Sequence, residues 1–167
     1  FLTSKNDWKI VTGSPGGSIS VRRWYNGNKW TWDHDKANLI FRRGSDGKIE
    51  AIDKGGVVYG IASVSGDLYT SGVYRITKKA GNTGWKWVNT TGSWKEFDNS
   101  GRMTAYGDRL GVTGRLLHEQ GDGGRLTGIS DRNNRRMITY EYNSDNRITA
   151  ATDVDNSGVL ADADEQD

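Results

Sequence analysis

The chain has 167 residues, of which 34% are hydrophobic, with 23 Gly, one Pro, seven Trp and seven Tyr. This length suffices for one domain with a hydrophobic core, and so many aromatic residues exclude a disordered chain. The lack of Cys excludes disulfides and thiolate metal sites. No apolar run reaches the ~18 residues of a membrane-spanning helix. No signal peptide opens the chain, so Phe1 is expected to follow a cut within a longer protein.

The formal net charge of +2 hides an uneven distribution. Residues 153–167 hold six acidic residues and no basic one, so the remainder carries +8 (+2 overall, less six negative charges). The basic residues come mostly as scattered pairs, such as Arg22–Arg23 and Arg42–Arg43. Because neighbours in a strand point to opposite faces, these pairs build no basic stripe, and we expect no nucleic-acid partner.

Apolar and polar residues alternate at several places, as in strands with one buried face. In chain order, this alternation covers residues 18–22, 30–32, 85–87 and 137–142. Clusters of Gly, Asn, Asp and Ser separate such stretches at intervals of mostly ~10 to 20 residues, which is typical of antiparallel hairpins. The sequence therefore predicts an all-β fold of consecutive antiparallel hairpins, in a twisted or partly wrapped sheet without a substantial helix.

A short pattern occurs three times in the second half of the chain. It reads GRMTAYGD at 101–108, GRLTGISD at 124–131 and NRITAATD at 146–153. Both the Arg and the closing Asp recur after 23 and then 22 residues. An aromatic residue stands five positions before the Arg in the outer copies, whereas the middle copy has Gln120 there. The residues of this pattern are Phe97, Arg102, Asp108, Arg125, Asp131, Tyr142, Arg147 and Asp153.

A period of about 22 residues accommodates two strands and two turns, so each copy is expected to form one hairpin. One hairpin cannot bury its apolar face alone, and neighbouring hairpins must therefore stack side by side. The Gly or Asn before each Arg suits a positive φ angle in the turn, and the closing Asp can bond the backbone of the next turn. We expect each Arg to reach a carboxylate or turn carbonyls of the adjacent hairpin. A weaker echo, SDGKIEAID, covers residues 45–53.

The three copies FDNSGRMTAYGD, GDGGRLTGISD and YNSDNRITAATD resemble the YD repeat of the Rhs family. The resemblance is specific over residues 97–153 and looser over 74–96. It suggests a β-rich lead-in segment at 1–73, repeat hairpins at 74–153 and an acidic tail at 154–167. Proteins of this family, together with teneurins and insecticidal toxin-complex subunits, form a long β-strand ribbon that coils into a hollow shell. In bacterial members the shell often encloses a C-terminal toxin.

The resemblance implies a non-catalytic structural module of a secreted or cell-surface protein, at an N-terminal or entry position of the ribbon. Such a module would be part of a shell or scaffold linked to toxin delivery or cell contact. Its expected partner is the remainder of a larger repeat protein, or another copy that pairs along an open sheet edge.

The acidic segment DVDNSGVLADAD at 153–164 follows the spacing of a calcium-binding loop. Asp153, Asp155 and Ser157 take ligand positions 1, 3 and 5, and Gly158 takes the sharp turn at position 6. Asp164 closes the loop at position 12, where Glu is usual, so the predicted grip on Ca²⁺ is weaker. The alternative is a solvated acidic tail. We expect no other cofactor.

Two pairs of tryptophans lie two positions apart, Trp30 with Trp32 and Trp85 with Trp87. Each pair is expected to share one sheet face. The rings form either the core of the fold or an exposed platform that stacks on sugar rings. We favour the core, since large exposed apolar patches are uncommon in monomers. A carbohydrate- or surface-binding module that uses exposed Trp and Tyr remains the alternative function.

Catalytic signals are sparse. In a strand, Asp33 and Asp35 would point away from His34, and His118 lacks the second His of a helical zinc site. The motifs of serine hydrolases and nucleotide-binding enzymes do not occur. Carboxylates are plentiful, which leaves a glycosidase pair in a cleft open as a third alternative. The prediction is that the chain is not an enzyme.

Overall fold

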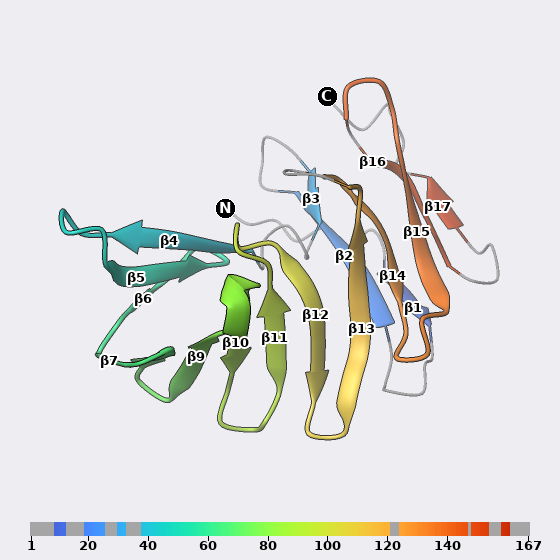
Figure 1. Ribbon diagram of the computed structural model, residues 1–167. Coiled ribbons are helices and arrows are strands. Elements are labelled where there is room, and N and C mark those ends of the chain that lie inside the picture. Colours follow the sequence, from blue (N-terminus) through green and yellow to red (C-terminus); the bar gives the residue numbers. More distant parts are fainter. Residues whose placement is uncertain are drawn as a thin grey trace. The chain divides into compact units, whose positions relative to one another are not determined.

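The computed structural model describes residues 9–12, 19–25, 30–32, 38–120, 124–146, 148–153 and 158–160. These residues form antiparallel strands joined by short turns, together with the 3-10 helix η1 (Ala80–Asn82) (Figure 1). The predicted all-β fold of consecutive hairpins is thus confirmed. The chain divides into a middle unit, His34–Leu110, and a split unit, Phe1–Asp33 with Gly111–Asp167. The predicted segment boundaries at 73 and 153 stay a prediction.

The middle unit contains two antiparallel sheets. The first consists of β4 (Leu39–Arg43), β5 (Ile49–Lys54) and β6 (Val57–Gly60). The strands that follow pair in sequence order; they are β7 (Ser63–Ser65), β8 (Leu68–Ser71), β9 (Tyr74–Lys78), β10 (Trp85–Val88), β11 (Trp94–Phe97) and β12 (Met103–Asp108).

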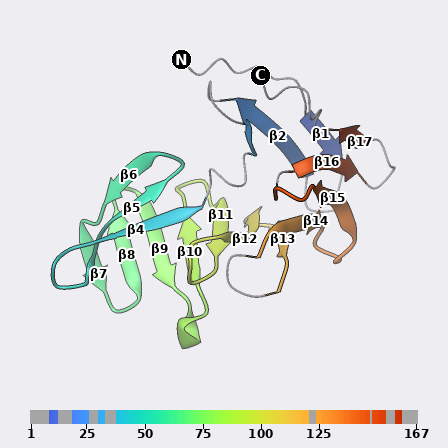
Figure 2. The same ribbon diagram turned by 90° about the horizontal axis from the view of Figure 1, so that it is seen from above.

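The chain passes from the first sheet to the second within two residues. The Ile61 amide still donates to the Glu50 carbonyl of β5 at 2.9 Å, whereas the Ala62 amide donates to the Thr70 carbonyl of β8 at 2.8 Å. A strand that changes sheets in this way turns a corner and brings the two sheets face to face. Figure 2 shows β4 and β5 lying over β8 and β9.

Aromatic rings fill the space between the two sheets of the middle unit. Trp85 and Trp87 are only 4% and 3% exposed. The Phe41 ring centroid lies 5.0 Å from that of Trp85, and the Tyr59 centroid lies 4.8 Å from that of Trp87. Removal of a buried ring of this size typically costs about 3–5 kcal/mol, so these contacts rank among the largest contributions to the stability of this unit. Its other buried apolar residues are Leu39, Ile49, Ile52, Ile76, Phe97, Met103 and Ala105.

The split unit also consists of strands that pair in sequence order. They are β13 (Gly111–His118), β14 (Leu126–Ser130), β15 (Arg136–Tyr142), β16 (Ile148–Asp153) and β17 (Gly158–Leu160). A three-stranded sheet of β1 (Lys9–Thr12), β2 (Ile19–Tyr25) and β3 (Trp30–Trp32) belongs to the same unit. Ile129 and Ile138, which are cross-strand partners, are fully buried. Because the successive residues Met137 and Ile138 are 3% and 0% exposed, both faces of the sheet are covered at this point.

Candidate functional site: the turn of the repeat

One turn geometry recurs at hairpins of both units. Its first residue donates its amide to the carbonyl four positions later, and the amide of its fourth residue donates back to the first carbonyl. At Asp98–Arg102 these distances are 2.9 and 3.1 Å. The turn is a three-residue loop between two strands. Such loops are the next most common hairpin connection after two-residue loops. We call this geometry the repeat turn. It begins at Gly44, Asn89, Asp98 and Asp131, and the described part of the turn that begins at Asn143 follows the same pattern.

The fourth residue of each repeat turn has a left-handed backbone. These residues are Gly47 (φ 78°), Gly92 (φ 87°), Gly101 (φ 91°), Asn134 (φ 62°) and Asn146 (φ 60°). Gly and Asn adopt this conformation at the least cost, which explains Gly101 before Arg102 and Asn146 before Arg147. Gly124, which precedes Arg125, does not have a positive φ, contrary to the prediction; there a Cβ would lie 2.1 Å from the Glu119 carbonyl oxygen.

In the turns that begin with Asp or Asn, the first residue holds the loop through its side chain; in the turn that begins at Gly44, Oδ1 of Asp46 accepts from the Lys48 amide instead. The Asp98 Oδ1 accepts hydrogen bonds from the amides of Ser100 and Arg102, both at 3.0 Å. Asp131 does the same for the amides of Asn133 and Arg135, both at 2.9 Å. Asn89 and Asn143 accept from the amide two positions later, at 3.1 and 2.9 Å. This arrangement is the Asx turn that gives Asp and Asn their preference for such loops. The Asp108 Oδ1 likewise accepts from the Leu110 amide at 2.8 Å.

Each repeat hairpin also contains a β-bulge just after the turn. Where β11 pairs with β12, Glu96 faces Ala105 and Phe97 faces Met103, so one residue on β12 is left over. The same shift occurs where β13 pairs with β14 and where β15 pairs with β16. The extra residue is the Thr of the sequence pattern in all three copies: Thr104, Thr127 and Thr149. A bulge adds local twist, so the pattern encodes curvature as well as a turn.

The bulges correct the sequence alignment of the middle copy. Phe97 faces Met103 and Tyr142 faces Ile148, and the residue in the corresponding place is His118, which faces Leu126. The aromatic position of the middle copy is therefore His118, and the assignment of Gln120 to it was wrong. The error arose because the loop of this copy is two residues longer between the aromatic position and the Arg.

Glu119 replaces the turn Asp in this longer loop. Its amide donates to the Arg125 carbonyl at 2.9 Å, and its carboxylate accepts from the Arg125 amide at 3.2 Å. The carboxylate also accepts from Nε of Arg125 at 2.9 Å. These bonds match those between Asp98 and Arg102, where Nε donates to Oδ2 at 2.8 Å. The longer side chain of Glu thus spans the wider loop.

The arginines differ from the prediction in part. Arg102 pairs with Asp98 of its own turn, because the Asx turn places that carboxylate beside it. Arg125 pairs with Glu119 of its own turn and also reaches the next copy. Its Nη1 donates to Oδ1 of Asn146 at 3.0 Å, and its guanidinium carbon lies 4.6 Å from the Tyr142 ring centroid. Arg147 lies outside the described residues.

Two of the turn carboxylates, Asp98 and Glu119, are stabilised in their charged form. Burial alone would raise the pKa of Asp98, but hydrogen bonds from Ser100 and Arg102 outweigh it and lower the pKa. The pKa of Glu119 is lowered chiefly by the side-chain hydrogen bonds of Arg125. A lowered pKa stabilises the folded state at pH values above the pKa of the unfolded chain. This contribution is lost as the pH falls through the pKa of the folded state.

Trp85 and Trp87 do not form an exposed platform on which sugar rings could stack. Both rings are buried between the sheets of the middle unit, so their faces cannot stack on a sugar. The reason is that β10 places both rings toward the opposite sheet, against Phe41 and Tyr59. The backbones of Trp30 and Trp32 form β3, but their side chains lie outside the described residues.

The predicted calcium ligands Asp155, Ser157 and Asp164 lie outside the described residues, as does the side chain of Asp153. Gly158 opens the short strand β17. Elsewhere, the residues that the structure describes contain no group of three or more His, Asp or Glu side chains that could hold a metal ion. The calcium loop stays a prediction.

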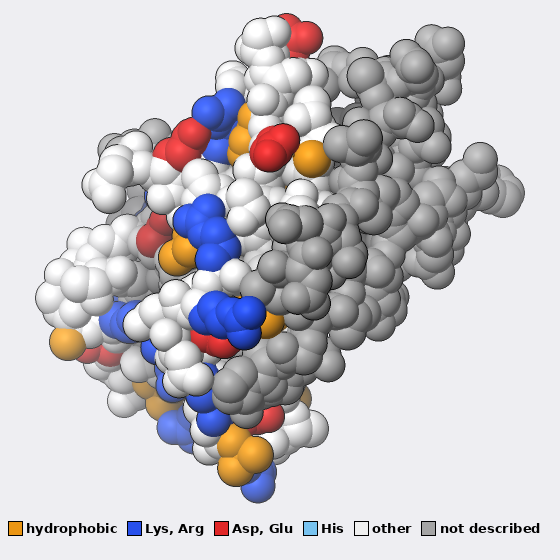
Figure 3. All heavy atoms as spheres, turned by 90° about the vertical axis from the view of Figure 1, so that its right-hand side faces the viewer, with side chains coloured by type: hydrophobic (Ala, Val, Ile, Leu, Met, Phe, Trp, Pro, Cys, Tyr) orange, Lys and Arg blue, Asp and Glu red, His pale blue; other side chains and the backbone are white. Residues whose placement is uncertain are grey.

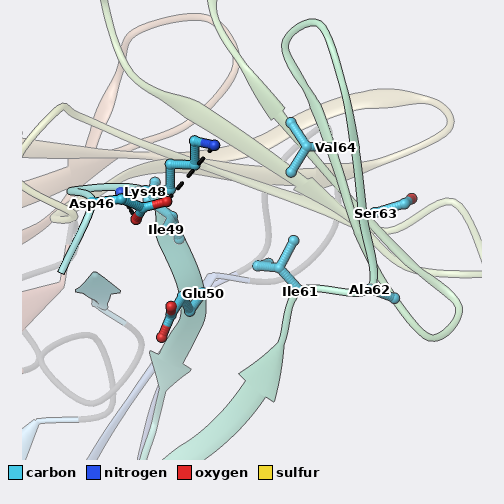
Figure 4. Close-up of a pocket in the computed structure, with 8 residues that line it drawn as sticks. All are labelled: Asp46, Lys48, Ile49, Glu50, Ile61, Ala62, Ser63 and Val64. Carbon is cyan, nitrogen blue, oxygen red and sulfur yellow. Dashed lines mark hydrogen bonds and ion pairs between the residues drawn. The ribbon is translucent and has the colours of Figure 1, made fainter. Parts of the chain in front are cut away.

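A shallow pocket of about 370 Å³ opens beside the corner where the chain changes sheets (Figure 4). Ile49, Ile61 and Val64 supply its apolar lining, and Asp46 and Lys48 lie at its rim. The Asp46 carboxylate accepts from the Lys48 amide at 3.0 Å and lies 3.7 Å from the Lys48 ammonium, so it is already engaged by its own turn. On the face in Figure 3, Lys and Arg side chains alternate with acidic and uncharged ones.

Two glycines at the same turn position allow the repeat turn to be tested. A Cβ at Gly101 would lie 2.2 Å from the Leu39 carbonyl oxygen, whereas a Cβ at Gly47 would meet nothing within 4 Å. Gly47→Ala should cost about 1–2 kcal/mol, the penalty of the left-handed backbone alone. Gly101→Ala should cost about 1–3 kcal/mol more, because the Leu39 backbone must also move. Denaturant unfolding of both variants measures the difference, and equal costs would contradict this account.

Comparison with known proteins supports the architectural interpretation. The family model described as RHS Repeat matches residues 122–157, which include the second strands of the middle and last copies. A search of curated proteins and a search of solved structures gave no match. The RHS repeat is a structural repeat. The matched residues contain the buried pair of β14 and β15 and the turns at Asp131 and Asn143, so this part of the chain is a YD/Rhs repeat.

Proposed function

We propose that this chain is a non-catalytic structural module of a larger YD-repeat protein. Its role is to supply a stretch of β-sheet wall in which each hairpin is fixed to the next. The observation that carries this proposal is the contact of Arg125 with two residues of the following copy, Tyr142 and Asn146. A side chain used in this way sets the register between hairpins.

The contacts between the middle and last copies run in both directions. Arg125 reaches forward to Asn146 and lies over the Tyr142 ring, and the Tyr142 hydroxyl donates back to the Leu126 carbonyl. A cation over an aromatic face and a charge-assisted hydrogen bond are both favourable in half-buried positions. Arg125 and Tyr142 of the pattern are therefore explained as the contact that joins the middle copy to the last one.

The larger protein is proposed to be secreted or exposed on the cell surface, and to act as a shell or scaffold in toxin delivery or cell contact. This part of the proposal is supported by the family, whose members are typically extracellular or surface-associated. The described residues include no helix that is long and apolar enough to span a membrane. The teneurin-like or toxin-complex-like character and the entry position in the ribbon belong to the same proposal.

Replacement of Arg125 tests the structural role. Arg125→Ala should lower the thermal midpoint by a few degrees, because it removes the Glu119 pair and both contacts with the next copy. The thermal midpoint of Arg125→Lys should fall between those of the unchanged chain and of Arg125→Ala, since Lys keeps the charge but not the planar, forked geometry. Arg135→Ala is the matched control: Arg135 is exposed and follows a repeat turn in the same unit. An Arg125→Ala variant that is as stable as the Arg135→Ala control would overturn the proposal.

We also propose that residues 153–164 bind Ca²⁺ weakly, on the ligand spacing of Asp153, Asp155, Ser157 and Asp164. Calorimetric titration of the full chain at physiological salt should give a saturable heat that Asp155→Asn removes. Asp162→Asn is the control, because it lowers the local charge equally and leaves these four ligand positions intact. If millimolar Ca²⁺ gives no heat, the segment is a solvated acidic tail.

A further inference from the structure

Two lysines of the middle unit flank one buried tryptophan. Lys54 lies at the end of β5, and its Nζ is 4.9 Å from the Trp87 ring centroid and 5.8 Å from that of Tyr59. Lys95 on β11 is the cross-strand partner of Trp87 on β10. Directly paired residues point to the same face of a sheet, so Lys95 and Trp87 are side by side on the face that Lys54 covers.

Among the residues that the structure describes, no carboxylate forms an ion pair with Lys54 or Lys95. The ion pairs of the described residues involve five other basic groups, namely Arg42, Lys48, Lys79, Arg102 and Arg125. Trp87 and Tyr59 attract the Lys54 ammonium through their ring faces but carry no countercharge. Burial and, second to it, the positive charge of Lys95 lower the pKa of Lys54. Two like charges thus lie beside the same ring, Trp87, and their repulsion costs free energy unless an anion joins them.

We propose that Lys54 and Lys95 form a binding site for a carboxylate group. Two ammonium groups can each donate to one oxygen of the same carboxylate, and such charge-assisted bonds are about twice as strong as neutral ones. The aromatic rings beneath the site exclude water on one side, which strengthens the attraction. A ligand ring cannot stack on Trp87 at this site, because Lys54 already covers the Trp87 face.

The carboxylate is that of a small free ligand, because two ammonium groups beside a covered aromatic face complement one carboxylate by charge. The site does not depend on the proposed structural role.

Competitive acylation tests the site in the folded full-length chain. A limiting amount of an amine-reactive ester labels each lysine according to its exposed, unprotonated fraction, and peptide mass spectrometry reports the relative rates. A bound carboxylate should slow the labelling of Lys54 and Lys95 several-fold, because it keeps both amines protonated and covered. Lys86 is the internal control: its Nζ also lies over an indole ring, 4.8 Å from the Trp94 centroid, but its cross-strand neighbour is Glu96 and not a second lysine.

Citrate is the probe for a free carboxylate, compared with sodium chloride at equal ionic strength. The proposal expects citrate to protect Lys54 and Lys95 but not Lys86, and expects Lys95→Gln to remove the protection of Lys54. If citrate does not change the labelling of Lys54 relative to Lys86, the proposal is overturned.

Discussion

The repeat hairpins of this protein depend on one hydrogen-bonded turn. A side-chain oxygen of Asp or Asn holds the amides of the loop, and a Gly or Asn in the left-handed conformation lets the chain reverse direction. In the longer loop Glu119 takes the place of the Asp. At Asp98 the carboxylate accepts two amides and also pairs with the Arg102 side chain. The loop is therefore fixed by its own residues before any contact with the rest of the sheet is made. Because these contacts are local in sequence, they favour hairpins that form early in folding and independently of one another.

The turn fixes which side chains enter the core. The bulge that follows it leaves Thr104 unpaired and places Met103 opposite Phe97, and both of these residues are buried. The same offset places Leu126 opposite His118 in the split unit. Because a one-residue slip would move every side chain to the other face of the sheet, the turn and its bulge protect the register that the core requires. Arg125 then extends this control to the neighbouring copy.

Much of the fold could be predicted, because alternation and turn residues are local signals. The pattern at 85–87 predicted β10, and the core interpretation of Trp85 and Trp87 agrees with their burial. The position of His118 could not be predicted, since a loop longer by two residues hides it from an alignment on the Arg. The corner at Ile61 and Ala62 could not be predicted either, because it depends on pairing with two different strands. A signal for the turn at Asn89 was present in the sequence: Asn at the first position and Gly at the fourth.

The central structural claim is that the repeat turns can replace one another. Exchange of one turn sequence for another tests this claim most directly. Residues 89–93 (Asn-Thr-Thr-Gly-Ser) would be replaced by the sequence of residues 98–102 (Asp-Asn-Ser-Gly-Arg), and the denaturant midpoint would be measured. Both segments form the repeat turn, with a left-handed Gly at position four. The account predicts an intact fold whose stability changes by no more than about 0.5 kcal/mol, the usual range for surface changes. Loss of several kcal/mol, or failure to fold, would contradict it.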